Sequence, residues 1–370
     1  MNWNDVRNEF PVCNKMVYLN PAGGSPLSKS AYKEARRYYD EMLELGDAPY
    51  DEWMKRTSDV RKQVAGYIGA SPSEIGFTTN TSHGMNIIAH ILKNRGGVLT
   101  MKDEFPSTTI PWLNQGVQLK MVDPVNGMYL LESIKDALTP DIKIIMTSYV
   151  QYATGFRQDL KTLGKFCKEN GYIFVVNATQ ALPVFPIDVK QMHIDFLVFT
   201  GLKWATAGYG IGGLYIDEKW LQSEKLPLAG WQSVQEPEAM NNLESKIRQE
   251  ASAIESGCPH FPNIFALGGA LTLFEAIGNY AAAERILELN AYLNKKLVAS
   301  GFKVLSTSED KYRSGITIVK HNNPKPVVKN LAEKNILVSA RGEGLRISVN
   351  VFNNEQDIDT LCYHLKNYIN

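Results

Sequence analysis

The sequence predicts an α/β fold, built on a mostly parallel seven-stranded sheet and followed by a smaller α+β C-terminal domain. Between residues 73 and 216, short apolar runs rich in β-branched residues alternate with amphipathic stretches. This alternation is typical of βαβ units that assemble a parallel sheet. Several of the runs are apolar at every position, which indicates strands buried on both faces. A long helical pattern and several short strands after residue 263 predict the second domain.

The expected elements follow in chain order. Two helices come first, at 29–45, opened by Pro26 and Ser28, and at 53–68, followed by Gly69. The strands of the sheet are expected at 75–78, 98–101, 118–122, 143–148, 173–176, 196–200 and 210–216. Residues 226–263, punctuated by proline and glycine, are interpreted as loops and a short helix that link the two domains.

The last hundred residues predict a helix at 264–300, strands at 302–305, 315–319, 336–339 and 345–349, and a closing helix at 355–368. We therefore expect a large α/β domain over residues 16–260. The smaller domain is expected to consist of residues 261–370 together with the N-terminal residues 1–15.

Composition and charge exclude several kinds of partner. Lys plus Arg and Asp plus Glu both number 39, so the formal net charge is zero, and no basic run stands out. Nucleic acids and membrane surfaces are therefore not expected partners. The four cysteines are far apart and form no metal-binding pattern, and the polar N-terminal residues contain no apolar run of the kind that a signal peptide has. We expect a cytoplasmic protein without a metal site.

A polar turn between a strand and a helix is the first candidate site. Thr81 and Ser82 stand where the helix after strand 75–78 begins. Free backbone N–H groups and the positive end of the helix dipole favour an anion there, so both residues could hold a phosphate. Ser and Thr are also the usual caps of any helix, and that alternative is the more frequent one.

Lys203 is the second candidate, because it follows a buried strand and stands between Leu202 and Trp204. A lysine with a lowered pKa in an apolar pocket suits Schiff-base chemistry, since only the neutral amine attacks a carbonyl. The alternative is a surface lysine whose long side chain carries its charge out to water.

Together these segments resemble the class V aminotransferase and cysteine desulfurase-like family of pyridoxal 5'-phosphate (PLP) enzymes, which have fold type I. The resemblance also rests on residues 18–22 (Tyr-Leu-Asn-Pro-Ala), 105–112, 255–259 (Glu-Ser-Gly-Cys-Pro) and 345–348 (Leu-Arg-Ile-Ser). It implies PLP as the cofactor, a small amino acid as the substrate, and a homodimer whose active sites lie at the interface.

The resemblance also implies roles for individual residues. Lys203 would be the Schiff-base lysine, and Phe105 would stack on the cofactor ring. The other implied cofactor contacts are Thr81, Ser82, Tyr152, Asn177, Gln180, Thr200 and Cys258. The substrate would be bound by Ala22, Arg341 and Arg346, with Arg346 as the carboxylate clamp.

One departure from the family pattern bears on the reaction. Asn177 stands where the family has an aspartate against the pyridine nitrogen. A carboxylate keeps that nitrogen protonated, which lets the ring accept electrons, and an asparagine has no charge to do so. The enzyme therefore runs chemistry that needs a weaker electron sink, takes the charge from another acid such as Asp188 or Asp195, or is catalytically weakened.

Other departures from the family pattern reduce the number of possible reactions. The loop at 339–344 has no cysteine, so desulfuration through a persulfide is disfavoured. Arg341 in that loop could contact a second acidic group of the substrate, or could simply be an exposed arginine. Leu202, Tyr152 and Cys258 replace the family's histidine, asparagine and threonine, which places the chain closer to the branch around isopenicillin-N epimerase.

The resulting hypothesis is a PLP-dependent enzyme that acts on a small amino acid, with class V aminotransferase chemistry as the default. A β-lyase or an epimerase is the alternative, because these reactions share the lysine, the phosphate site and the carboxylate clamp. The rival from another class is a catalytically weakened protein that binds PLP without turnover.

Overall fold

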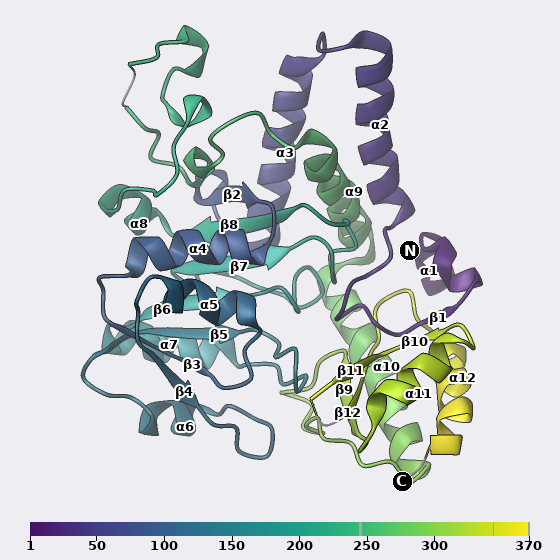
Figure 1. Cartoon of the computed structure of the whole chain (residues 1–370). Helices are drawn as coiled ribbons and strands as arrows, with labels where there is room; N and C mark the ends of the chain where they lie inside the picture. The colour runs from purple at the N-terminus through teal and green to yellow at the C-terminus, as the bar shows by residue number, and fades with distance from the viewer. Residues whose placement is uncertain (244–245, 343, 369–370) are drawn as a thin grey trace.

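A seven-stranded sheet forms the centre of the computed structural model, which describes residues 1–243, 246–342 and 344–368 (Figure 1). Its strand order is β2-β8-β7-β6-β5-β3-β4. Among the described strands of this sheet, β8 alone runs in the opposite direction to the others. The strands are β2 (Ile75–Thr78), β3 (Gly97–Met101), β4 (Leu119–Val122), β5 (Ile142–Ser148), β6 (Ile173–Asn177), β7 (Phe196–Thr200) and β8 (Gly212–Ile216). The predicted fold class is confirmed, and each strand lies at its predicted place with small shifts of its ends.

The apolar runs form strands because both of their faces are covered. Val175 and Val198 point into one buried cluster, whereas their neighbours Val176 and Leu197 point into the other. Since successive side chains of a strand alternate between faces, each strand serves two cores at once. The helix α4 (Thr81–Leu92) contributes to the first cluster, and α7 (Leu160–Asn170) to the second.

The helix α2 begins and ends as predicted (Lys29–Leu45), with the Ser28 side chain accepting a hydrogen bond from the backbone N–H of Ala31. The helix α3 (Tyr50–Ile68) begins three residues before its predicted start and ends at Gly69, whose φ of 67° is left-handed. These two helices project from the sheet and pack against α9 (Phe261–Ile277) (Figure 1). Shorter helices complete this part: α5 (Pro106–Asn114), α6 (Leu131–Asp136) and α8 (Glu218–Ser223).

The C-terminal part has a three-stranded antiparallel sheet in the order β11-β12-β9. Its elements are α10 (Asn279–Ala299), β9 (Ile316–Lys320), α11 (Pro324–Ala332), β10 (Ile336–Leu337), β11 (Ser339–Arg341), β12 (Gly344–Ser348) and α12 (Glu355–Leu365). The N-terminal α1 (Trp3–Asn8) and β1 (Val17–Tyr18) pack here: β1 pairs with β10, and Arg7 forms an ion pair with Asp357. The domain boundaries given above stay a prediction.

Three expectations for this region are wrong. The pattern at 264–300 is two helices, because the backbone turns at Gly278 with φ 88° and the helix axes differ by 80°. Residues 302–305 form no strand, and Val304 makes only an isolated bridge to Val319. The strand expected at 336–339 is divided into β10 and β11, which pair with different partners.

Residues 226–260 consist of loops and short 3-10 turns in their described part.

The four cysteines are free thiols. Among the described residues no single helix is long and apolar enough to cross a membrane, although the bent pair α9 and α10 together meets the same test.

Candidate active site

The carboxyl ends of the parallel strands bring most of the predicted site residues together. In the register of the sheet, Thr78 at the end of β2 and Thr200 at the end of β7 both pair with Gly212, so they lie in one row. The helix α4 begins at Thr81, just beyond this row, and the Thr81 hydroxyl lies 2.6 Å from that of Thr179. Ligands of open α/β sheets bind at this edge.

The amino end of α4 is held against β7 because Gly84 has no side chain. A Cβ at this position would lie 2.8 Å from Cγ1 of Val198. Buried Thr81 and Thr200 and exposed Ser82 therefore lie near free backbone N–H groups. The hydroxyls of Thr81 and Ser82 and the helix end offer the donors that a phosphate needs, whereas the Thr200 hydroxyl donates to the carbonyl of Ile211 at 3.2 Å.

Lys203 lies in the turn after β7 with a desolvated amine. Burial, together with the nearby positive charges of Arg346 and Arg341, lowers its pKa to about 7. Its Nζ is 5.2 Å from the centre of the Phe105 ring. A large fraction of this amine is therefore neutral at pH 7 and able to attack a carbonyl.

Phe105 stands at the start of α5 and is 41% exposed, which leaves part of its ring open toward a ligand. The Tyr152 ring meets it edge to face, with 5.2 Å between the ring centres. The structure thus places the predicted stacking residue, Tyr152 and Lys203 side by side.

Gln180 has an amide orientation that its neighbours fix. The indole N–H of Trp204, which can only donate, donates to Oε1 at 2.7 Å. The Gln180 Nε2 donates to the backbone carbonyl of Ala22 at 3.0 Å, and the Ala22 N–H donates to Ser348 Oγ at 3.2 Å. One N–H of Gln180 remains for a ligand oxygen, and Ala22 is tied to the strand that carries Arg346.

Asn177 is fixed in the same way at the end of β6. The backbone N–H of Thr179 must donate to Oδ1, at 3.0 Å, so Nδ2 faces Thr108 Oγ1 at 2.9 Å. The amide is 4% exposed. Thr108 takes one of the two N–H groups of Nδ2, so Asn177 keeps one N–H that it can offer to a ligand.

Glu104 was missed by the sequence reasoning, although it directly precedes Phe105 and follows a buried strand. Its carboxyl accepts hydrogen bonds from Ser148 N (2.6 Å), Ser148 Oγ (2.5 Å) and Gln151 Nε2 (2.7 Å). Burial raises the pKa of Glu104, whereas these bonds and one from Thr108 oppose the rise. Thr108 therefore joins a buried carboxyl to Asn177. A carboxylate just after a buried strand is the signal that identifies such a residue.

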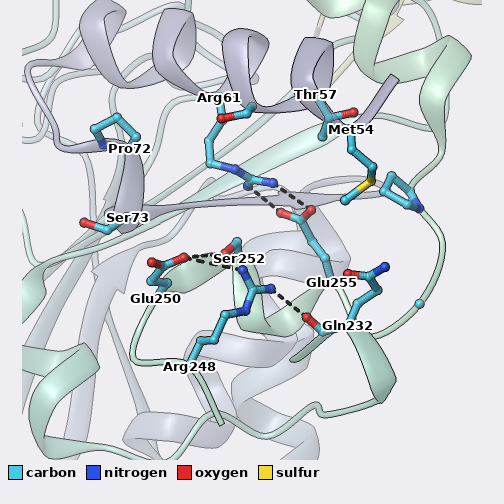
Figure 2. Close-up of a pocket in the computed structure, with 13 residues that line it drawn as sticks. Met54, Thr57, Arg61, Pro72, Ser73, Gln232, Arg248, Glu250, Ser252 and Glu255 are labelled. Atoms are coloured by element: carbon cyan, nitrogen blue, oxygen red, sulfur yellow. Dashed lines mark hydrogen bonds and ion pairs between the residues drawn. The ribbon is translucent and has the colours of Figure 1, made fainter. Parts of the chain in front are cut away.

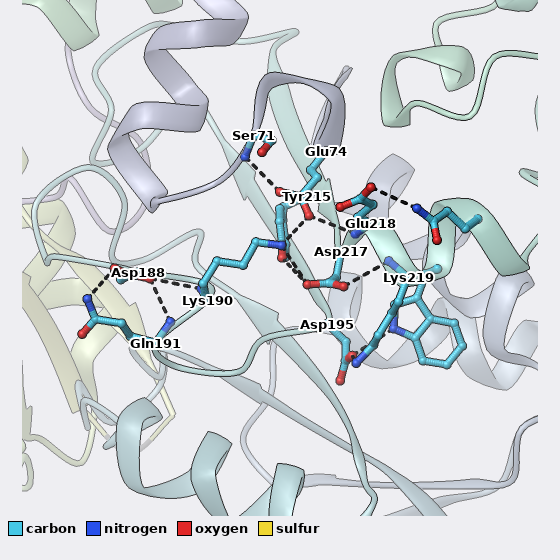
Figure 3. Close-up of polar contacts among 12 residues, drawn as sticks. Ser71, Glu74, Asp188, Lys190, Gln191, Asp195, Tyr215, Asp217, Glu218 and Lys219 are labelled. Carbon is cyan, nitrogen blue, oxygen red and sulfur yellow. Dashed lines mark hydrogen bonds and ion pairs between the residues drawn. The ribbon is translucent and has the colours of Figure 1, made fainter.

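Asp188 and Asp195 do not supply the charge that Asn177 lacks. Asp195 lies at the amino end of β7, where it accepts hydrogen bonds from Phe174 N and the Trp220 indole and pairs with Lys219. Asp188 caps the turn before Lys190 (Figure 3). Both carboxylates are structural and lie away from the row of Thr78, Gly212 and Thr200.

Arg346 is 1% exposed and lies in the middle of β12. Its Nη1 donates to the carbonyl of Tyr152 at 3.3 Å, while Nε and Nη2 are buried without a partner. Burial lowers the pKa of Arg346 to about 10, and the charge of Arg341 acts in the same direction. Buried polar atoms are normally satisfied, so this free edge of the guanidinium indicates a missing anionic ligand.

Cys258 has no described contact with the other predicted cofactor-binding residues. Its side chain is exposed. The pKa of Tyr50 in α3 is raised, mainly by burial of Tyr50 and to a lesser extent by the nearby Cys258. The same segment lines a cavity of about 320 Å³, where Glu255 binds Arg61 through two bonds of 2.6 and 2.9 Å (Figure 2). Glu255 also accepts from Phe77 N, so it anchors the motif to β2.

PLP carries a phosphate, a phenolic oxygen, a ring nitrogen and an aldehyde, and this edge of the sheet fits each of them. The amino end of α4 supplies phosphate donors, Gln180 and Asn177 supply one free N–H each, and Lys203 supplies the amine. The unpartnered edge of Arg346 leaves room for a substrate acid. The fold and the site together define a PLP-dependent enzyme of fold type I.

The comparisons with known proteins specify the family. The model of the family "Aminotransferase class-V" matches residues 17–361. The chain belongs to this family, whose cofactor is PLP.

Two relatives illustrate its range. A probable cysteine desulfurase of Methanothermobacter thermautotrophicus is 26% identical, with 98% of this chain and 96% of the relative covered. A kynureninase of Bacillus thuringiensis is 26% identical, with 96% and 88% covered.

Solved structures agree in fold. The apo cysteine desulfurase of Thermococcus onnurineus has a TM-score of 0.90 at 24% identity, covering 99% of this chain and 98% of that one. A complex of the cystine C–S lyase C-DES with cysteine persulfide also has a TM-score of 0.90, at 20% identity, covering 97% and 99%.

Proposed function

We propose that this protein is a PLP-dependent enzyme that removes a β-substituent from a small amino acid, a lyase rather than the aminotransferase that the sequence favoured. The carrying observation is the fixed amide of Asn177, which has one free N–H to offer the cofactor's ring nitrogen and no negative charge. A ring nitrogen that accepts this N–H has no proton of its own. Elimination tolerates that state, because the electrons from the α-carbon leave with the β-substituent and are not stored in the ring.

The other side chains have roles that follow from their positions. The Lys203 amine holds the cofactor's aldehyde carbon and, once released, takes the α-proton at Nζ, for which a pKa of about 7 is suitable. Arg346 holds the substrate carboxylate through Nε and Nη2. When bound, PLP supplies the conjugated ring that withdraws electrons from the α-carbon. Phe105 covers the amine and limits access of water.

Two further observations support this choice. The strand β11 carries Ser339, Ala340 and Arg341 without a cysteine, so a persulfide has no nucleophile there. A kynureninase and a cystine C–S lyase are among the proteins that this chain resembles. Transamination stays the second candidate, because the family model that matches is that of the class V aminotransferases.

The visible spectrum of the purified protein with added PLP tests the function. We expect an absorbance band that is absent from Lys203→Ala, and that shifts with one class of amino acid as the β-leaving group, a keto acid and ammonia are released. A band that no amino acid disturbs would indicate binding without turnover. No band at all would contradict the proposal.

Replacing Asn177 with aspartate is expected to raise transamination relative to elimination by about tenfold. A carboxylate beside the ring nitrogen shifts the pKa of that nitrogen upward by one unit or more, and each unit is a factor of ten. The ratio is given by the ammonia released, which comes from elimination, and the aminated cofactor formed, which comes from transamination. The control is Asn170→Asp, the same change at an exposed site on α7. An unchanged ratio in Asn177→Asp would show that the ring nitrogen does not face this residue.

We further propose a homodimer. Cys258 is exposed on its loop, and apolar side chains of α2 and α5 are exposed as well, among them Leu43 (86%), Ile110 (57%) and Leu113 (57%). Exposed apolar groups of this kind are typical of interfaces. Sedimentation equilibrium should report twice the mass of the chain, and a monomer at micromolar concentration would rule the dimer out.

A further inference from the structure

Two arginines of the small domain lie on the same face of one hairpin. In the register of β11 and β12, Ser339 is opposite Arg346 and Arg341 is opposite Gly344. Directly opposed residues of antiparallel strands share a face, and so do residues two apart on one strand. Arg341 and Arg346 are therefore diagonal neighbours, about 7–8 Å apart at the backbone. Gly344 has no side chain to separate them.

The two guanidinium groups are used differently. Arg346 is buried, and its two free donors, Nε and Nη2, lie on one edge and fit a single carboxylate. Arg341 is exposed, and its Nη1 donates only to the carbonyl of Ala340 at 2.8 Å. Among the described residues, its other N–H groups have no acceptor, and its charge is close enough to lower the pKa of Arg346. The hydroxyl of Ser339, buried and without a partner, lies on the same face.

Three positive charges lie at this edge: Lys203, Arg341 and Arg346. Within residues 1–243, 246–342 and 344–368, no carboxylate forms an ion pair with Lys203, Arg341 or Arg346. The charges are close enough to act on one another: after burial, Arg341 is the next cause that lowers the pKa of Arg346, and both arginines lower that of Lys203. One substrate carboxylate compensates Arg346 and leaves Arg341 uncompensated.

We infer that the substrate carries a second acidic group at the end of its side chain, a carboxylate or a similar oxyanion, and that Arg341 binds it beside Ser339. The inference rests on the proposed function, because it takes the α-carboxylate to be the ligand of Arg346. Arg341 then determines specificity: it selects acidic amino acids over neutral ones of the same shape.

Equilibrium binding tests this without turnover. The PLP-loaded protein is titrated by calorimetry with succinate and with succinamate, which has the same shape but one neutral end. We expect succinate to bind at least tenfold more tightly. In Arg341→Gln the ratio of the two dissociation constants should fall toward one. Arg36→Gln, an exposed arginine on the distant helix α2, is the matched control and should keep the ratio of the parent.

The outcomes separate the two proposals. Equal affinity of the parent for succinate and succinamate, or a preference that survives in Arg341→Gln, would overturn the assignment of Arg341 while the Lys203-dependent absorbance band persists. Loss of that band in the parent would instead contradict the proposed function. Arg341 is exposed, so its replacement is not expected to impair folding, and unchanged melting of the variant verifies this.

Discussion

Replacing Lys203 with methionine should raise the free energy of unfolding of the cofactor-free protein at pH 7 by about 2–4 kcal/mol. The lysine has a pKa of about 7 in the folded chain, against an ordinary value of 10.5, because its amine is desolvated beside Arg346 and Arg341. Each unit of that difference corresponds to about 1.4 kcal/mol of destabilisation while the unfolded chain keeps its proton. Methionine has a similar length and no charge to desolvate.

The pH dependence has a definite sign. Between pH 7 and pH 10.5 the unfolded chain binds the proton and the folded chain does not, so the stability of the parent protein rises with pH across this window. The advantage of Lys203→Met is therefore largest at and below pH 7 and shrinks toward pH 9.5. Urea denaturation at pH 6.5, 8 and 9.5 measures it.

An exposed lysine provides the control. Lys161 lies on the surface of α7, and Lys161→Met should change the free energy of unfolding by less than about 0.5 kcal/mol at any of these pH values. If the gap between the parent and Lys203→Met were constant with pH, the amine would not be desolvated in the cofactor-free protein. The low pKa on which its role as a base depends would then be wrong.

Replacing Arg346 with leucine is expected to lower kcat/KM by a factor of about 100 to 4,000, and to leave the Lys203-dependent absorbance band in place. A buried charge that loses its partner costs about 3–5 kcal/mol, and in this variant the uncompensated charge is the substrate carboxylate. The band persists because Arg346 donates only to the Tyr152 carbonyl among the described residues around the cofactor site.

Steady-state kinetics with the preferred amino acid give the loss directly. The matched control is Arg346→Lys, which keeps the positive charge but has no fork to bind both carboxylate oxygens, so we expect an intermediate loss. A decrease of less than threefold in Arg346→Leu would mean that the substrate carboxylate is held elsewhere. Arg341 would be the first candidate to examine.

The succession of strands in the large sheet could be predicted because the local pattern is strong. Most runs from β2 to β8 are apolar on both faces, which is typical of strands in a covered parallel sheet, and β4 at the edge is the exception. The strands of the small C-terminal sheet were harder to predict from the sequence. They are short, and the division of 336–339 between β10 and β11 depends on β1, which is more than 300 residues earlier in the sequence. The break at Gly278 is also a matter of packing, because glycine is tolerated within helices.

The sequence by itself determined the fold class, the cofactor family and the residues that stand at the strand ends, since these depend on periodicity and on motifs of adjacent residues. The tertiary structure alone decided how those residues are oriented. Thr179 and Trp204 fix the amides of Asn177 and Gln180, Glu104 reaches Asn177 through Thr108, and a hairpin brings Arg341 beside Arg346. Hydrogen bonds and charges between residues far apart in the chain set these orientations, and no local pattern carries them.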